Sequence, residues 1–343
     1  MRLLRAELRK LRRPLVAWTA LAIVAIVGLH AWGLQRSAKS TLSGTQFGAG
    51  PIPTCQQMNL PEGSAQCRQI QDQNRRVFCA EQNVHLGPQC DQAIAQAQAQ
   101  AQQGFQEFVR QEAGPARSAK AMQNPLGGGI LAAGMMASMV GAVALLLLAA
   151  GHVGNEWSGK TIKQVLAQEG RRWRVLLAKL FSLWLLGIAL LLVLWGALAI
   201  LAPIFASAYH LPVPSVSGGS ALSLSLRVAW RALLVLAAFA TLGTLCAVVT
   251  RNTLGSFFLA FAFVIASQIL APYKWIGRFT LASHVAGWMG FHSSDLALNH
   301  LWRDDFYPLK FPTHTAGLIG LAVTIVVFVA LALLRLERSD VKV

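Results

Sequence analysis

The chain has 343 residues, of which 55% are hydrophobic and only 13% charged, and its formal net charge is +16 at pH 7. Soluble domains carry about 25% charged residues, so this composition excludes an ordinary soluble enzyme and favours a membrane protein. The basic residues gather beside long apolar stretches, which indicates membrane topology and argues against a nucleic-acid partner.

Residues 1–13 are predicted to form an amphipathic helix at the membrane surface. They contain six Lys or Arg and one Glu. Leu4, Leu8 and Leu11 fall on one helical face, and most arginines fall on the other, where lipid phosphates attract them. A simpler alternative is a basic flank that only sets topology. The apolar run that follows has full span length and no convincing cleavage site, so we expect an uncleaved first span.

Six stretches are apolar and long enough to cross a bilayer, which takes about 20 residues per helix. They are residues 14–34, 127–151, 175–206, 228–249, 254–271 and 316–334. The predicted fold class is therefore an all-α polytopic membrane protein with six transmembrane helices.

Charge sets the expected orientation of these spans. Residues 152–179 carry six Lys or Arg against two Glu, and further basic residues lie in the turn 250–253 and in the tail 335–343. With six spans, all these segments lie on one side. The positive-inside rule then places both termini in the cytoplasm, in a multi-pass protein of the cell membrane surrounded by lipid.

Residues 35–126 form the largest predicted external region, and they contain four cysteines in the pattern C-x11-C-x11-C-x10-C. They are Cys55, Cys67, Cys79 and Cys90. The spacing lacks a C-x-x-C pair, which argues against zinc, and cysteines outside the cell form disulfides. We expect two bridges, which would replace part of the missing core, but all three pairings remain open. Cys246, within the fourth span, is expected to stay free.

Two other external segments are predicted. Residues 207–227 form a loop, and residues 272–315 have an aromatic, amphipathic composition suited to interfacial or re-entrant helices. Histidines recur in the second segment without carboxylates at helical spacing, so we predict no metal site there.

The segment Gly154–Thr161 fits the phosphate-loop pattern G-x-x-x-x-G-K-[ST]. That pattern binds nucleotide only where a buried strand leads into the loop. Here an uncharged stretch of span length, residues 127–151, precedes it. We interpret the match as accidental and predict that the chain is not an enzyme and binds no cofactor itself.

Residues 152–174 are predicted to form a cytoplasmic loop that contains a short helix. Ile162, Val165 and Leu166 lie on one face of this helix, at a spacing suited to a groove on a soluble partner. The alternative is an interfacial loop with no partner.

This loop resembles the signature of the type-2 ABC exporter permease family. The resemblance rests on an acidic residue followed by an aromatic one, a Thr, a Leu-rich turn, an Arg and an Ala-Lys-Leu start of the next span. The matching residues are Glu156, Trp157, Thr161, Val165, Leu166, Arg172, Ala178, Lys179 and Leu180. The chain departs from the family where Lys160 replaces the usual Gly and where Glu169 and Gly170 replace a Pro turn. The layout of surface helix, six spans and loop helix also agrees along the whole chain.

The resemblance implies a permease that works with separate subunits. ATP and Mg would bind to ATP-binding cassette ATPase subunits, and a second permease, identical or homologous, would complete a dimer. The loop helix would couple to the ATPase through Glu156, Trp157, Thr161, Ile162, Val165, Leu166 and Arg172.

The resemblance also implies that spans two and five line the substrate path. Candidates there are Met135, Met136, Met139, Phe257, Phe258 and Phe261, because thioethers and aromatic rings suit a broad apolar ligand. Arg227 and Arg231, at the external start of span four, would meet an anionic or amphipathic substrate. Plain helix packing and headgroup anchoring are the alternatives for these residues.

The predicted function is export of a hydrophobic or amphipathic compound, such as a peptide, an antibiotic or a lipid. The alternative is a membrane sensor whose external region binds a ligand. A membrane-embedded enzyme is disfavoured because the spans contain almost no paired acids or nucleophiles.

Overall fold

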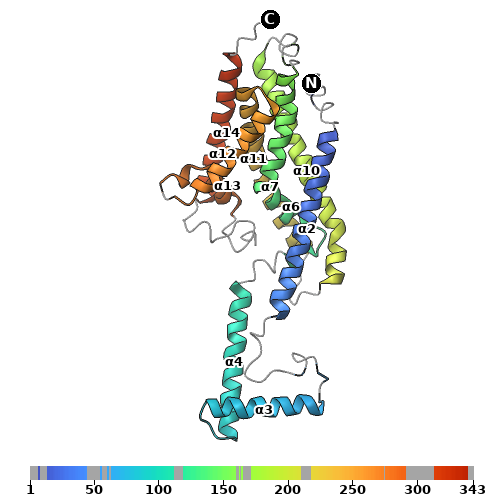
Figure 1. The fold of residues 1–343 in the computed structure, drawn as a ribbon, viewed down its shortest axis with the longest axis vertical. Coiled ribbons are helices and arrows are strands. Elements are labelled where there is room, and N and C mark those ends of the chain that lie inside the picture. The colour runs from blue at the N-terminus through green and yellow to red at the C-terminus, as the bar shows by residue number, and fades with distance from the viewer. Residues whose placement is uncertain are drawn as a thin grey trace.

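The computed structural model describes residues 7, 14–44, 55, 60–61, 63–111, 119–159, 162, 164, 171–209, 218–273, 275–290 and 313–338. Within these ranges the regular elements are helices and no strand occurs. Figure 1 shows long helices running side by side as a bundle, with a separate pair of helices away from it. The all-α prediction is confirmed.

Six helical segments are long and apolar enough to cross a membrane, as the sequence predicts. Five of them are α2 (Pro14–Gly44), α10 (Arg172–Ala208), α11 (Gly218–Thr250), α12 (Thr253–Leu270) and α14 (His314–Glu337). The remaining one belongs to the second predicted span, which is built from several consecutive pieces.

The second span begins as α6 (Gly128–Met136), breaks, and resumes as α7 (Met139–Ala149). At the break, the Ser138 hydroxyl donates to the carbonyl oxygen of Met135 at 2.7 Å and accepts from the amide of Val140 at 3.3 Å. A serine at this position caps the new helix. A side chain at Gly141 would collide with the Met136 carbonyl at 1.9 Å, so the bend requires glycine there.

Helix α11 is the centre of the bundle and contacts α6, α7, α10, α12 and α14. Small buried residues such as Ala238, Ala240 and Ala247 lie along it. Small side chains let helix backbones approach closely, which stabilises helix packing in a membrane. By contrast, α2, α12 and α14 keep most of their surface outside the core.

A short helix, α13 (Leu281–Met289), lies between spans five and six and packs against α14 and α12. Thr280 caps its start by accepting from the amide of Ser283 at 3.3 Å, and Gly290 ends it at a positive φ of 72°. This is the element that the aromatic composition of residues 272–315 predicts. No group of three or more His, Cys, Asp or Glu side chains suited to a metal ion occurs among the described residues.

The region predicted to be external contains two helices joined by a short turn, α3 (Ala65–Glu81) and α4 (Pro88–Gln111), which lie at a wide angle to one another (Figure 1) and which we call the hairpin. Disulfides join Cys55 to Cys67 and Cys79 to Cys90, each with a Cα–Cα distance of 5.7 Å. The two predicted bridges are confirmed, and each cysteine pairs with its sequence neighbour. Cys246 is free and buried.

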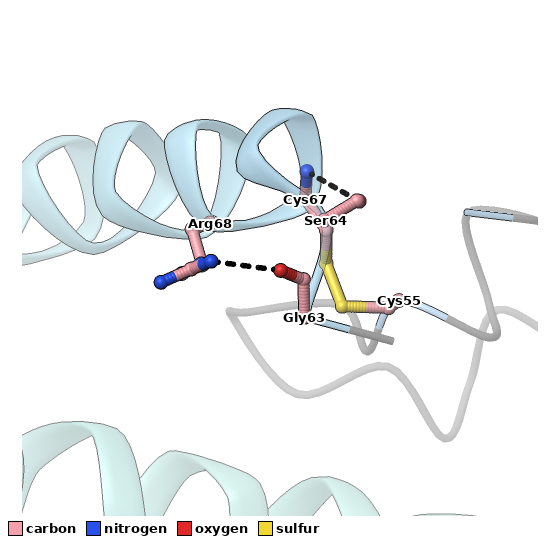
Figure 2. The surroundings of a disulfide bond; sticks show 5 residues. All are labelled: Cys55, Gly63, Ser64, Cys67 and Arg68. Atoms are coloured by element: carbon pink, nitrogen blue, oxygen red, sulfur yellow. Dashed lines mark hydrogen bonds between the residues drawn. A yellow bond between two sulfur atoms is a disulfide. The ribbon is translucent and has the colours of Figure 1, made fainter. Parts of the chain in front are cut away.

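Each bridge fixes one end of α3. At its start, Ser64 accepts from the Cys67 amide at 3.2 Å beside the first disulfide (Figure 2). At its end, the Cys79–Cys90 bridge and Ile94 form a small buried cluster that holds α3 against α4. The hairpin stands away from the bundle, at the end opposite the C-terminal end of α14 (Figure 1).

Candidate coupling site

The second span does not stop at the membrane boundary predicted at Gly151. It continues through a π-helical turn, η2 (Ala150–Gly154), into α8 (Asn155–Ser158). Isolated π-helical turns are rare and occur frequently at functional sites. All five residues of η2 are buried. A helix leads into Gly154–Thr161, and residues Asn155–Ser158 are themselves helical, whereas the phosphate-loop pattern requires a strand before the loop.

The exit from span two is fastened to the start of α12. A Cβ atom at Gly154 would lie 2.8 Å from Thr253 Cα, so the two backbones meet here. The Thr253 hydroxyl donates to Asn155 Oδ1 at 2.7 Å, and it lies 3.3 Å from the Ser158 hydroxyl. Asn252 caps α12 by accepting from the Leu254 amide at 2.9 Å. Movement of α8 therefore has to involve α12.

A buried charge cluster lies next to this junction. The ammonium of Lys179, on α10, is 2.7 Å from Glu156 Oε2 and 3.1 Å from Glu7 Oε2. The exposed fraction is 2% for Lys179, 4% for Glu156 and 1% for Glu7. Charges this deeply buried persist only when they are paired, because desolvation of each ion is costly.

His152 extends the cluster from the π-helical turn. Its Nε2 is 3.1 Å from the same Glu7 oxygen and 3.2 Å from the Ser182 hydroxyl. That hydroxyl donates its one hydrogen to the Lys179 carbonyl oxygen at 2.8 Å, and an ionised carboxylate only accepts. His152 Nε2 therefore carries the hydrogen, and both the Glu7 carboxylate and the Ser182 oxygen lie within its reach. We call Glu7, His152, Glu156, Lys179 and Ser182 the buried polar cluster.

The buried polar cluster joins three separate parts of the chain. Glu7 comes from the N-terminal segment, His152 and Glu156 from the end of span two, and Lys179 and Ser182 from span three. Glu7 is the one described residue of the predicted surface helix 1–13, and the rest of that helix lies outside the described residues.

Trp157 and Arg251 lie next to this junction. The Arg251 guanidinium is 5.2 Å from the centre of the Trp157 ring. Arg251 occupies the tight turn between α11 and α12, where its φ is 55°. A cation over an indole face is stabilising. The contact ties α8 to that turn.

Arg172 begins α10 and reaches the C-terminal end of α14, at the same end of the bundle. Its Nη1 donates to the carbonyl oxygens of Leu336 at 2.9 Å and Glu337 at 3.0 Å. The last carbonyls of a helix have no partner within the helix, so Arg172 supplies the cap of α14. The loop is thus fixed to span two at its start and to span six at its end.

The loop residues themselves are only partly described. Ile162 is helical and 4% exposed, so it packs within this chain and is not free to fill a groove on a partner. Thr161, Val165 and Leu166 lie outside the described residues. We keep Val165 and Leu166 as candidate docking residues and leave Ile162 out.

The sequence-predicted path residues do not converge on one cavity. Met135 and Met136 are buried in α6. Met139 lines a cavity of about 460 Å³ between α2 and α7, and a small one of about 10 Å³ at the α6–α7 break. Phe257 stacks on Phe261 with ring centres 5.7 Å apart, on α12.

Phe258, Arg227 and Arg231 have other surroundings. Phe258 is largely exposed and meets the Phe257 ring edge to face at 5.5 Å. Arg231 donates to the Met289 carbonyl oxygen at 3.2 Å and lies over the Trp288 ring, so it joins α11 to α13. Arg227 is exposed on α11.

Sequence reasoning missed Glu7, His152 and Ser182, and it treated Lys179 only as part of a motif. One signal was available: an ionisable residue in or beside an apolar span is a functional candidate by default. That rule selects His152 and Lys179. It does not show that Glu7, 172 positions away from Lys179, is their partner.

Comparison with known proteins gives one match. The sequence model of the family described as ABC-2 family transporter protein matches residues 1–341. No curated protein and no solved structure matches this chain.

Proposed function

This chain belongs to the ABC-2 family of transporter proteins, and from that premise we propose that it exports a hydrophobic or amphipathic compound with ATPase subunits supplied by separate chains. Family membership makes it a transmembrane permease of an ABC transporter. To this family assignment the proposal adds the direction of transport, the class of substrate and the partner subunits.

The observation that carries the proposal is the buried polar cluster beside the cytoplasmic loop. A loop that merely connected two spans would not need three buried ionic side chains from three segments, because such a cluster is costly to desolvate. The cluster fixes Glu156, at the start of the loop, to span three, while Arg172 fixes the end of the loop to span six. A push on this loop would therefore reach several spans together, as coupling to a separate ATPase requires.

The cavity between α2 and α7 supports the substrate class. Its volume of about 460 Å³ falls within the range of about 300–1,000 Å³ that is usual for small-molecule sites. Its lining includes Trp18, Ile26, Met139 and Leu147, so it suits an apolar compound such as a peptide, an antibiotic or a lipid.

The proposed partners follow from the same premise. ATP-binding cassette ATPase subunits would bind ATP and Mg, and a second permease, identical or homologous, would complete the transport path. We place the protein in the cell membrane with both termini cytoplasmic, and we assign Val165 and Leu166 to the ATPase contact.

The experiment is copurification of the ATPase with this permease, followed by measurement of substrate-stimulated ATP hydrolysis. Val165→Asp with Leu166→Asp should release the ATPase or abolish stimulation, because each aspartate would bury an unpaired charge at the contact. The matched control is Val77→Asp with Leu86→Asp, two exposed positions on the external hairpin. Full retention of binding and stimulation by the loop variant would refute the coupling assignment.

A further inference from the structure

A second apolar groove lies on the membrane-facing side of the bundle, between α10 and α14. Its volume is about 540 Å³. Leu177, Phe181 and Trp184 of α10 form one wall, and Ile325 and Val329 of α14 form the other. The floor is α11, where Ala237, Ala240 and Thr241 line the groove.

The groove is closed at its cytoplasmic end. There α10, α11 and α14 meet through Leu176, Leu180, Val248, Ala332 and Leu336, which form a buried cluster of their own. The hydrogen bonds of Arg172 to the last carbonyls of α14 hold the two wall helices together at the same end. Further into the membrane the helices part and leave the groove open.

The interior of the groove offers no free polar group to a ligand. The Thr241 hydroxyl donates to the Ala238 carbonyl oxygen at 2.8 Å, and the Trp184 indole donates to the Leu233 carbonyl oxygen at 2.9 Å. Both donors are therefore satisfied within the protein. The part of a ligand that fits here is hydrocarbon.

The ends of the two wall helices just beyond the closed end of the groove are strongly positive. Arg174 is exposed and lies four residues before Ala178, so it continues the lining face of α10 by one turn. Arg335 is exposed in the last turn of α14. Neither forms an ion pair within the part of the chain that the structure describes. Among the described residues at these two helix ends, the arginines are Arg171, Arg172, Arg174, Arg335 and Arg338 and the acid is Glu337, with Arg172 engaged by the last carbonyls of α14.

We propose that this groove binds one anionic phospholipid of the cytoplasmic leaflet. An acyl chain lies between Phe181 and Val329, and the phosphate lies at Arg174 and Arg335. Both halves of the ligand are required, because the walls of the groove accept only hydrocarbon and the arginines just beyond its closed end attract negative charge. Anionic headgroups in this leaflet gain affinity from each nearby basic side chain. The site is independent of the substrate assigned above.

The test uses the purified full chain in detergent with equal amounts of phosphatidylglycerol and phosphatidylcholine, and native mass spectrometry counts the retained lipids. We expect one phosphatidylglycerol per chain, retained in preference to phosphatidylcholine. Ala237→Phe fills the floor and should abolish this retention. Ala330→Phe, an exposed position on α14 outside the groove lining, is the control and should keep it.

The charge contribution is tested separately. Arg174→Gln with Arg335→Gln should lower the preference for phosphatidylglycerol about fivefold per arginine, and so about 25-fold for the pair. Arg278→Gln, at an exposed arginine in the external segment, is the matched control and should have no effect. Equal retention of both lipids by the parent chain would overturn the proposal.

A second measurement tests acyl-chain binding without the Ala237→Phe variant, in case that variant misfolds. Phosphatidylglycerol with brominated chains should quench part of the tryptophan fluorescence of the parent chain, and Trp184→Phe should remove that part. No difference in quenching between these two proteins would refute acyl-chain binding in the groove. A change in subunit number with Ala237→Phe, without lipid loss, would instead show that the groove is a protein interface.

Discussion

Lys179→Met is the most direct test of the buried polar cluster. The substitution keeps most of the side-chain volume and the apolar stem but removes the ammonium. Glu156 then loses the cation 2.7 Å away, and Glu7 loses the one 3.1 Å away. Glu7 keeps the His152 ring 3.1 Å away.

The expected magnitude follows from the burial of all three side chains. Removing one partner from a buried ion pair costs about 3–5 kcal/mol, because the other charge stays buried without compensation. An exposed pair contributes only about 0–1 kcal/mol. Since Lys179 is 2% exposed, we expect the larger range for Lys179→Met. Adding Glu156→Gln to Lys179→Met should restore part of the lost unfolding free energy. The expected coupling free energy between the two positions is about 0.5–3 kcal/mol.

The assay is reversible unfolding in mixed micelles, compared for the parent, the two single variants and the double variant. Lys39→Met is the control, since Lys39 is exposed near the C-terminal end of α2 with its ammonium 5.6 Å from the Tyr209 ring. If Lys179→Met lowered the unfolding free energy by less than about 1 kcal/mol, the reasoning would be refuted, because that is the contribution of an exposed ion pair. Strictly additive effects of Lys179→Met and Glu156→Gln would show that the two side chains do not interact.

Three other predictions concern the external bridge, the end of span two and the loop. Replacing Cys79 and Cys90 by Ser should destabilise the hairpin by about 2–4 kcal/mol; we expect faster proteolysis within α3 and α4 but intact spans, and an unchanged rate would contradict this. Gly154→Ala should lower the unfolding free energy by about 1–3 kcal/mol through overpacking against α12, measured in the same micelles, where stability equal to the parent would count against the close approach. Lys160→Ala should leave the ATP affinity of the assembled complex unchanged, and loss of nucleotide binding in equilibrium dialysis would restore the phosphate-loop interpretation.

The membrane spans could be predicted because the length of an apolar stretch is enough to identify a transmembrane helix. A stretch as long and apolar as residues 228–249 is not expected in a soluble protein, and the structure places it within α11. The break at Ser138 was not predictable, since one serine between apolar residues is common within spans. It becomes a helix cap only because its hydroxyl reaches the Met135 carbonyl and the Val140 amide. A serine side chain competes with the helix for backbone hydrogen bonds only where the backbone geometry allows it. Composition contains no information on that geometry.

The candidate site shows a different limit. The motif around Glu156 and Arg172 identifies the loop, but not what either residue contacts. Glu156 pairs with Lys179, 23 positions later, and Arg172 reaches Leu336, 164 positions later, at the end of α14. Contacts between distant segments follow from the packing of the spans. Periodicity and spacing describe one segment at a time and therefore cannot supply them.

Span two links the two features to which our proposal assigns a role in transport. Its middle piece, α7, is 11 residues long and so extends about 16 Å. One end adjoins the break at Ser138, beside the small cavity that Met139 and Gln268 line. The other end continues through the π-helical turn to Glu156 and the buried polar cluster. An intact helix between two fixed ends moves as one body, so a displacement of the loop reaches the break without being absorbed on the way. The break is therefore where we expect movement imposed at the cytoplasmic end to change the shape of the path.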